Sequence, residues 1–130
     1  MKIERELMRG AGPLAVLKLL SRREMYGYEL VEALASKTDG VLAMGQSTLY
    51  PLLYNLEAKG LIDSSWQRTE AGRERRYYRI TDKGRKQLAE DSKRWRALAG
   101  AMASLGVLPA GNEAGRTVVP GTAISGLGVA

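Results

Sequence analysis

The sequence contains no cysteine and no histidine among its 130 residues. This rules out disulfides, thiolate or imidazole zinc sites, Cys or His nucleophile systems and imidazole acid-base catalysis. The remaining carboxylates, lysines and serines are scattered through charged segments, without a glycine-rich phosphate loop or a paired-carboxylate motif. We therefore expect a protein that is not an enzyme and that uses no cofactor and no metal ion.

Long apolar runs are also missing. No run approaches the roughly 20 residues needed to span a bilayer, and the start "MKIERELMRG" lacks the hydrophobic stretch of a signal peptide. We expect a cytoplasmic protein without a membrane partner.

The composition that is present suits one small domain with an anionic partner. A chain of 130 residues with 45% hydrophobic content has room for a single core. With 20 Lys and Arg against 14 Asp and Glu, the net charge is +6. This charge favours nucleic acid or a membrane surface as partner, although many small proteins are equally basic.

The segment 46–62, "QSTLYPLLYNLEAKGLI", combines an amphipathic helical pattern with an unusual outer face. Leucines recur at spacings that place them on one side of a helix, at Leu49, Leu52, Leu53 and Leu56. The opposite side carries Ser47, Pro51, Tyr54, Asn55 and Ala58, with Thr48 and Tyr50 beside it. A solvated face is normally rich in Glu, Lys and Arg, so this face suits a groove. Taken alone, the pattern is equally compatible with an ordinary surface helix.

Proline and glycine set the expected limits of this helix. Proline lacks an amide hydrogen and clashes with the carbonyl four residues earlier, here that of Ser47, so a cap at Ser47 or Thr48 gives least strain. A start at Gly45 would place Pro51 inside the helix, at a cost of up to about 3 kcal/mol. Gly60 is expected to end it.

Two further helices are expected before this one. The segment 13–24 predicts a helix with Pro13 in its first turn. Residues 2–9 are either a short helical arm or an extension interrupted by Gly10 and Gly12. The segment 26–37, "YGYELVEALASK", predicts a second helix that ends near residues 38–40, and the apolar residues 41–44 are a candidate brief strand.

After Gly60 the pattern predicts a β-hairpin and a long helix. Two strand candidates, 61–68 and 75–80, flank the polar tip "TEAGRE". Alternation places Ile62, Ser64 and Trp66 on one face of the first strand, and Arg76, Tyr78 and Ile80 on one face of the second.

Thr81 is a suitable cap for a helix that runs to about Leu105. A short heptad-like seam on this helix predicts an interface with a second copy, formed by Leu88, Trp95, Leu98, Met102 and Leu105. Residues 107–130 are rich in Gly and Ala and predict a flexible tail, with an extra strand as the less favoured alternative.

The order helix, helix, helix, hairpin, long helix is that of a winged helix-turn-helix. "YGYEL", "TLYPLLYNLEAKGLI", "SSW", "GRERRYYRIT", "KGRKQL" and Trp95 resemble the PadR family of bacterial transcriptional regulators in order and spacing, over roughly residues 10–105. The resemblance implies a mainly α fold with a small β-hairpin wing (α+β). It divides the chain into a DNA-binding domain (1–80), a C-terminal dimerisation helix (81–106) and a tail (107–130).

The resemblance also implies a homodimer that binds double-stranded operator DNA in the nucleoid. Members of the family usually act as repressors and release DNA when a small aromatic or phenolic effector binds. The absence of the larger regulatory domain of other members puts a separate effector domain in doubt. We instead consider Trp95, at the seam, as an effector contact, with simple dimer packing as its favoured role.

In the family the "TLYPLL" helix enters the major groove. A carboxamide can donate and accept at once, as adenine requires, so Gln46 and Asn55 are the candidates for base contacts. Phosphate contacts are expected from Tyr28, Ser47, Thr48, Tyr50, Tyr54 and Lys59. The wing arginines Arg73, Arg75 and Arg76 are expected to lie along the backbone or to reach into a narrow minor groove.

A different class of function stays open at this point. A winged helix can serve as a protein-interaction module, in which the basic wing is only solvated and the tyrosine face docks another protein. Saturable binding to promoter DNA that survives competitor DNA distinguishes the regulator from this alternative.

Overall fold

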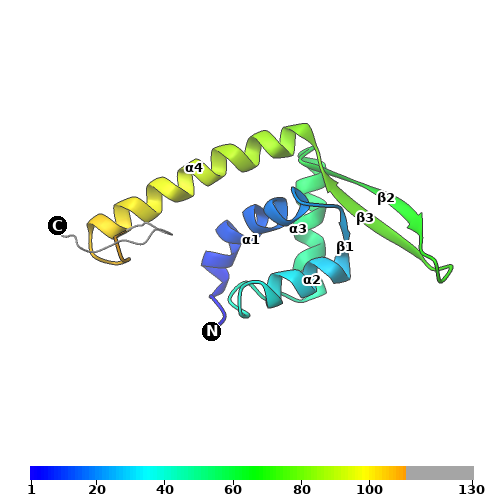
Figure 1. Cartoon of the computed structure of the whole chain (residues 1–130), viewed down its shortest axis with the longest axis horizontal. Coiled ribbons are helices and arrows are strands. Elements are labelled where there is room, and N and C mark those ends of the chain that lie inside the picture. Colours follow the sequence, from blue (N-terminus) through cyan, green and yellow to red (C-terminus); the bar gives the residue numbers. More distant parts are fainter. Residues whose placement is uncertain (111–130) are drawn as a thin grey trace. The chain divides into compact units, whose positions relative to one another are not determined.

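The computed structural model describes residues 1–110 of the chain. These residues form α1 (Arg5–Leu20), β1 (Met25–Tyr26), α2 (Gly27–Ser36), α3 (Gln46–Ala58), β2 (Ile62–Arg68), β3 (Glu74–Ile80) and α4 (Asp82–Ser104) (Figure 1). The predicted α+β winged helix-turn-helix is confirmed. Most of the predicted tail, residues 111–130, lies outside the described residues.

The described residues fall into two compact units that divide after Asp91, within α4. The first unit holds the three short helices, the sheet and the first turns of α4, and the second holds the rest of α4. The functional division that we predict after residue 80 stays a prediction.

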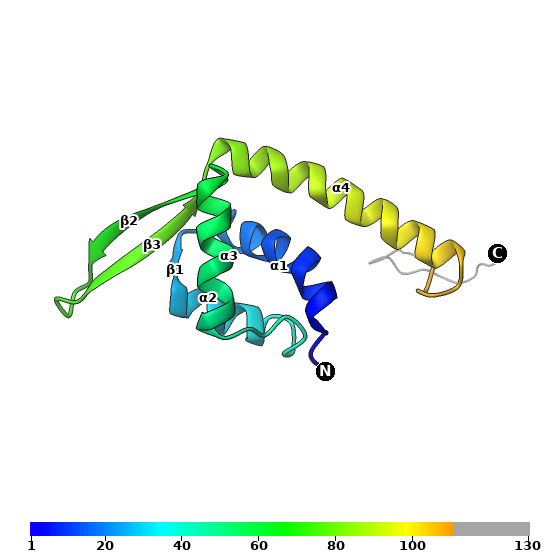
Figure 2. The ribbon, with the colours of Figure 1, turned by 180° about the vertical axis from the view of Figure 1, so that it is seen from behind.

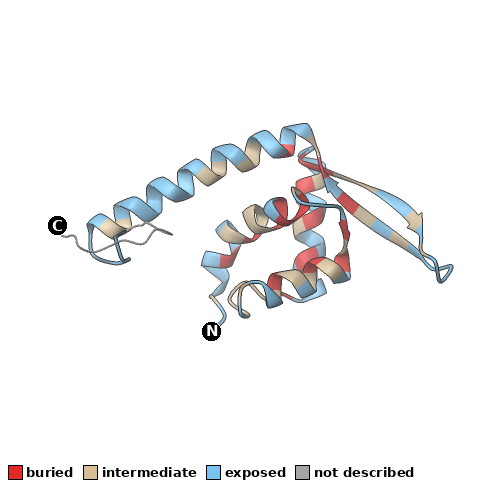
Figure 3. Ribbon diagram, viewed as in Figure 1, coloured by how far each residue is buried: buried red, intermediate tan, exposed pale blue. Residues whose placement is uncertain are grey.

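The core of the first unit lies where α1, α2 and α3 face one another, and it continues to the base of the hairpin (Figure 3). The periodic apolar positions of the three helices supply its least exposed side chains, which include Leu17, Leu20, Leu30, Leu34, Leu49 and Leu53. The outer half of the hairpin contributes nothing to this core, because its side chains there are mostly exposed.

The sheet is antiparallel with the strand order β1-β3-β2. Ile62 pairs with Ile80, Ser64 with Tyr78 and Trp66 with Arg76, which confirms the predicted faces of the hairpin. Strand β1 was not predicted from the sequence, because a strand of two residues is too short to show an alternating pattern. The strand expected at residues 41–44 is wrong, since these residues form a turn and a loop.

Helix α1 begins eight residues before the expected start, so Pro13 lies inside it. The Glu4 carboxylate caps the new start by accepting a hydrogen bond from the Glu6 amide at 2.7 Å. The extension buries Met8 against the core. Pro13 removes the amide that would meet the Arg9 carbonyl, on an exposed residue where water can hydrate it. Tertiary burial therefore outweighs the local cost of the proline.

Helix α3 likewise starts earlier than expected, with Gly45 as its N-cap and Pro51 inside. The cap at Ser47 or Thr48 is therefore wrong. The Gly45 carbonyl accepts the first helical bonds, from Thr48 at 3.1 Å and Leu49 at 3.0 Å. The carbonyl that Pro51 leaves without an amide belongs to Ser47, which is exposed, and this lowers the cost of the proline.

Helix α4 is joined tightly to the hairpin. The Thr81 hydroxyl accepts a hydrogen bond from the Gly84 amide at 3.0 Å, which confirms Thr81 as the cap. Gly84 lies so close to the Leu61 carbonyl oxygen that a β-carbon there would overlap it. Within residues 1–110, none of the helices combines the length and the apolar character that crossing a membrane requires.

Candidate nucleic-acid interface

The outer face of α3 is exposed along its whole length. Its exposed side chains are the short hydroxyls, amides and phenols noted in the sequence, at Gln46, Ser47, Thr48, Tyr50, Tyr54 and Asn55. The two tyrosines differ in exposure, with 73% of the surface of Tyr54 accessible and 42% of that of Tyr50. The one acidic residue of α3, Glu57, is paired with Arg76 and Ser64, so a face of this polarity can approach the edges of base pairs.

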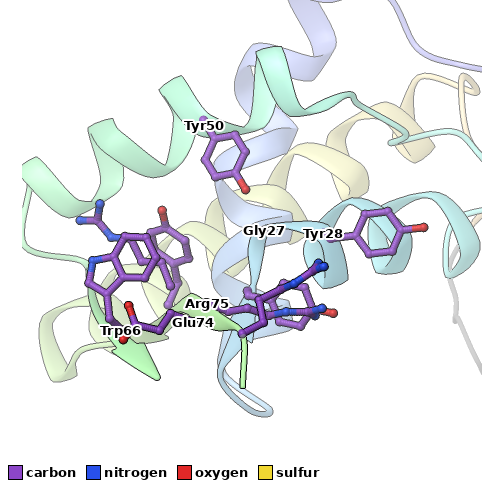
Figure 4. Close-up of a pocket in the computed structure, with 10 residues that line it drawn as sticks. Gly27, Tyr28, Tyr50, Trp66, Glu74 and Arg75 are labelled. Carbon is purple, nitrogen blue, oxygen red and sulfur yellow. The ribbon is translucent and has the colours of Figure 1, made fainter. Parts of the chain in front are cut away.

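A groove of about 670 Å³, which we call the wing groove, lies between α3, the start of α2 and the hairpin. It is lined by Tyr26, Gly27, Tyr28, Tyr50, Trp66, Arg73, Glu74, Arg75, Arg76 and Tyr78. In Figure 4, Tyr50 points from α3 towards the start of α2 at Gly27, and Arg75 comes from the hairpin on the other side. Five of the predicted DNA contacts therefore meet in one groove, although they are far apart in the sequence.

The three wing arginines have different surroundings. Among the described residues, no hydrogen bond or ion pair holds the side chain of Arg73, which is exposed next to the hairpin turn. The Arg75 guanidinium lies 4.2 Å from the centre of the Tyr26 ring. This cation-π contact orients Arg75 but leaves its N–H groups available.

Arg76 is tied to α3. Its Nε donates to the Ser64 hydroxyl at 2.9 Å, and its guanidinium lies 3.4 Å from the Glu57 carboxylate. Ser64 in turn donates to Glu57 at 2.8 Å. This network links the hairpin to α3, so the structure gives Arg76 a clear role in positioning the wing, whereas its predicted phosphate contact stays a prediction.

Two tyrosines of the wing groove, Tyr28 and Tyr78, have raised pKa values. A hydrogen bond with Glu32, followed by the charge of the same carboxylate, raises the pKa of Tyr28 above its ordinary value of 10.0. Burial raises the pKa of Tyr78. Tyr78 packs in the core, as expected of a strand residue, while the Tyr77 ring meets Tyr26 edge-on at 5.4 Å.

A second groove, which we call the arm groove, lies between α3 and the N-terminal segment and holds about 630 Å³. Residues of α3 that form one wall are Thr48, Pro51, Leu52 and Asn55. The other wall carries Lys2, Arg5 and Arg9, and Ile3, Met8, Pro13, Ala43 and Met44 complete the lining. Two predicted DNA contacts, Thr48 and Asn55, therefore lie here.

The remaining predicted contacts of α3 lie outside both grooves. Gln46, Ser47 and Tyr54 are exposed on the same helix. Lys59 caps the far end of α3, about 20 Å from Gln46 by the helical rise. Gln46 and Lys59 therefore cannot contact the same base pair.

Sequence reasoning missed Trp66 and the cations of the N-terminal segment. Trp66 lies on the hairpin face that the alternation predicted, yet 66% of it is exposed, because the helices cover only the base of the hairpin. The sequence showed the charges of Lys2, Arg5 and Arg9, but not that α1 begins at Arg5 and that all three residues lie alongside α3.

The second unit presents apolar residues at heptad-like spacing. Trp95 is 39% exposed, Leu98 47% and Leu105 76%, and Met102 follows the same spacing. Leu88, which belongs to the first unit, packs against that unit's core. An uncovered apolar stripe of this kind is typical of an interaction surface, and its role in dimerisation stays a prediction.

Comparison with known proteins gives a consistent picture. The family model described as "Transcriptional regulator PadR-like family" matches residues 16–90. The chain is 40% identical over 95 residues to the transcriptional regulator Rv3488 of Mycobacterium tuberculosis, covering 73% of this chain and 85% of the relative.

Solved structures give the same result. A PadR family transcriptional regulator from Eggerthella lenta is 38% identical, with a TM-score of 0.67 and coverage of 77% of this chain and 85% of that one. A PadR-like transcriptional regulator from Bacillus cereus is 31% identical, with a TM-score of 0.70 and coverage of 78% and 96%.

Proposed function

The chain belongs to the transcriptional regulator PadR-like family, and from this premise we propose that it is a homodimer which binds operator DNA sequence-specifically and represses the adjacent promoter. The observation that carries the proposal is the face of α3. It is exposed, it is flanked by two grooves that carry arginines, and the one carboxylate of the helix, Glu57, is paired with Arg76.

In this proposal α3 enters the major groove. Asn55 and Gln46 read base edges, because their carboxamides donate and accept together. Ser47, Thr48, Tyr54 and Lys59 contact phosphates beside them. Tyr28, Tyr50, Arg73 and Arg75 contact the backbone that passes along the wing groove, and Arg76 holds the hairpin at the angle that this requires.

The dimer is formed through α4. In a two-fold dimer the seam of one chain meets its own copy, so the uncovered residues Trp95, Leu98, Met102 and Leu105 cover one another. Leu88 extends the seam where its packing in the first unit leaves it accessible. Two DNA-binding heads held in this way read two half-sites about one helical turn apart.

We further propose that binding of a small effector near Trp95 releases the protein from DNA. Two Trp95 rings that approach across the two-fold axis leave a slot that suits a flat aromatic or phenolic molecule. Stacking contributes roughly 0.5 to 1.5 kcal/mol per ring pair beyond the buried area. A ligand that prefers one separation of the two heads would change their fit to DNA.

A titration of the labelled promoter duplex of the protein's own operon tests this function. Fluorescence anisotropy is measured with the promoter duplex and with a scrambled duplex of equal length, at several salt concentrations. We expect at least tenfold tighter binding to the promoter and a steep loss of affinity with salt. Equal, salt-insensitive binding to both duplexes would instead favour a protein-interaction module.

A further inference from the structure

We propose that the N-terminal segment is a second clamp on DNA, in which Lys2, Arg5 and Arg9 bind the phosphate backbone on the side of α3 opposite the wing. The inference rests on the proposed function, because it assumes that α3 lies in the major groove. It assigns a contact to a part of the chain that lies outside the winged-helix motifs.

The arrangement of the two grooves carries the argument. In Figure 2 the hairpin lies on one side of α3 and the N-terminal end of the chain on the other. Both grooves share a wall with α3, through Tyr50 in the wing groove and through Thr48, Pro51 and Asn55 in the arm groove. Arginines line both.

The positions of the two grooves, one on each side of α3, match the geometry of the DNA major groove. A major groove is about 12 Å wide and is bounded by a phosphate backbone on each side. A helix inserted there has one backbone along each flank. If the wing groove receives one backbone, then the arm groove faces the other, and it holds three cations where phosphates pass.

The segment that carries the cations is held in place, and the ion pair of Arg9 is exposed to solvent. The Ile3 amide donates to the Val41 carbonyl at 3.2 Å, which fixes the segment beside the loop before α3. Glu4 is occupied as the helix cap, and neither Glu4 nor Glu6 lines the groove. The pair between Arg9 and Glu6 spans 3.8 Å between side chains that are 71% and 76% exposed, so a phosphate can displace it.

Charge also argues against a second copy as the occupant. The floor of the arm groove is apolar, so a helix of a partner chain is the alternative to consider. The seam of α4, however, is flanked by the cations Lys93, Arg94 and Arg96 and by two carboxylates, Glu90 and Asp91, at its start. A surface of such mixed charge complements the three cations of the arm less well than DNA phosphates do.

The test compares two triple variants of the full chain with equal loss of charge. The arm variant is Lys2→Gln, Arg5→Gln and Arg9→Gln. The control variant is Lys18→Gln, Arg22→Gln and Lys86→Gln, three exposed cations that line neither groove. For each we measure the salt dependence of binding to promoter and scrambled duplexes, phosphate ethylation interference, thermal unfolding and the oligomeric state by sedimentation.

We expect the arm variant to flatten the slope of log K against log salt by up to about 3 units, since each phosphate contact contributes about 0.9. Ethylation interference should disappear on the backbone at one flank of the major groove and remain at the other. The control variant should keep both flanks and lose less of the slope.

Three outcomes would overturn the inference. If the arm variant keeps the slope and the interference pattern of the wild type, then the arm does not contact DNA. If it dissociates the oligomer while its monomer unfolds normally, the groove is a subunit contact. If both variants flatten the slope equally, the effect is one of net charge. A wild type that shows no salt-dependent binding would refute the proposed function itself, which makes the two failures distinguishable.

Discussion

Gly27 at the start of α2 and Tyr50 on α3 lie in direct contact. A β-carbon on Gly27 would lie 2.7 Å from Cζ of Tyr50 and would overlap its hydroxyl oxygen. The absence of a side chain at position 27 therefore fixes where the Tyr50 phenol lies, in the wall of the wing groove.

This contact predicts that Gly27→Ala displaces Tyr50. We expect lower thermal stability and at least a several-fold loss of DNA affinity, although alanine is the better helix former by about 0.5 to 1 kcal/mol. In a Tyr50→Ala background the clash is absent, so the same substitution should become neutral or stabilising. Denaturant unfolding of the four variants measures this coupling. If Gly27→Ala destabilises the Tyr50→Ala background as much as the wild type, Gly27 does not position Tyr50.

Arg76→Ala should act mainly on stability. Loss of the bonds to Ser64 and Glu57 should lower the free energy of unfolding by about 1 kcal/mol, a value kept modest because both charged side chains are partly exposed. Arg68→Ala is the matched control, since its pair with Glu74 is more exposed, at 67% and 60%. Urea unfolding compares them, and equal effects would mean that the Arg76 network adds nothing.

Arg73→Ala should act mainly on DNA binding. Removing one phosphate contact should flatten the slope of log K against log salt by about 0.9 on promoter and scrambled DNA alike, and leave stability within about 0.5 kcal/mol. An unchanged slope would remove the tip of the wing from the interface.

Features that depend on local periodicity were predictable from the sequence, whereas features that depend on tertiary contacts were not. The leucine spacing predicted the buried side of α3, and strand alternation predicted which residues share a face of the hairpin, because both depend on local periodicity. The positions of Pro13 and Pro51 were misjudged, since burial of Met8 and hydration of exposed carbonyls are tertiary effects that local rules omit.

The candidate site followed the same pattern. The sequence indicated which residue types could contact DNA, and the family resemblance assigned Tyr28, Tyr50 and the wing arginines to such contacts. It could not separate Arg73 from Arg76, because the partner of Arg76 is Glu57, 19 positions away on another element. The arm groove could not be predicted either, because its lining residues come from segments that are far apart in the sequence.

Asn55→Ala should reduce specificity. If Asn55 reads a base, the substitution should cost about 1 to 3 kcal/mol on operator DNA and leave binding to random DNA nearly intact. Competition titrations with both duplexes measure the difference. Equal losses on the two would mean that Asn55 only positions the protein, and Gln46 would become the leading reader.

Trp95→Ala should weaken the dimer. An interface anchor that contributes 2 kcal/mol or more raises the dissociation constant at least about 30-fold on truncation. Sedimentation equilibrium measures it, with Arg96→Ala as the neighbouring control outside the predicted seam. A dimer that tolerates Trp95→Ala would contradict the α4 interface.

A Trp66→Phe variant leaves Trp95 as the only tryptophan, so fluorescence reports on the seam. Titration with planar aromatic compounds should quench it if Trp95 also contacts an effector. No quenching by any compound would leave Trp95 with packing alone.

Selection of ligands from a pool of random DNA duplexes with the purified protein tests whether α3 reads DNA sequence as part of a dimer. We expect enrichment of an inverted repeat whose half-sites are centred about 10 base pairs apart, and loss of one base preference in each half-site with Asn55→Ala. Recovery of an unenriched pool, or of single sites without symmetry, would contradict it.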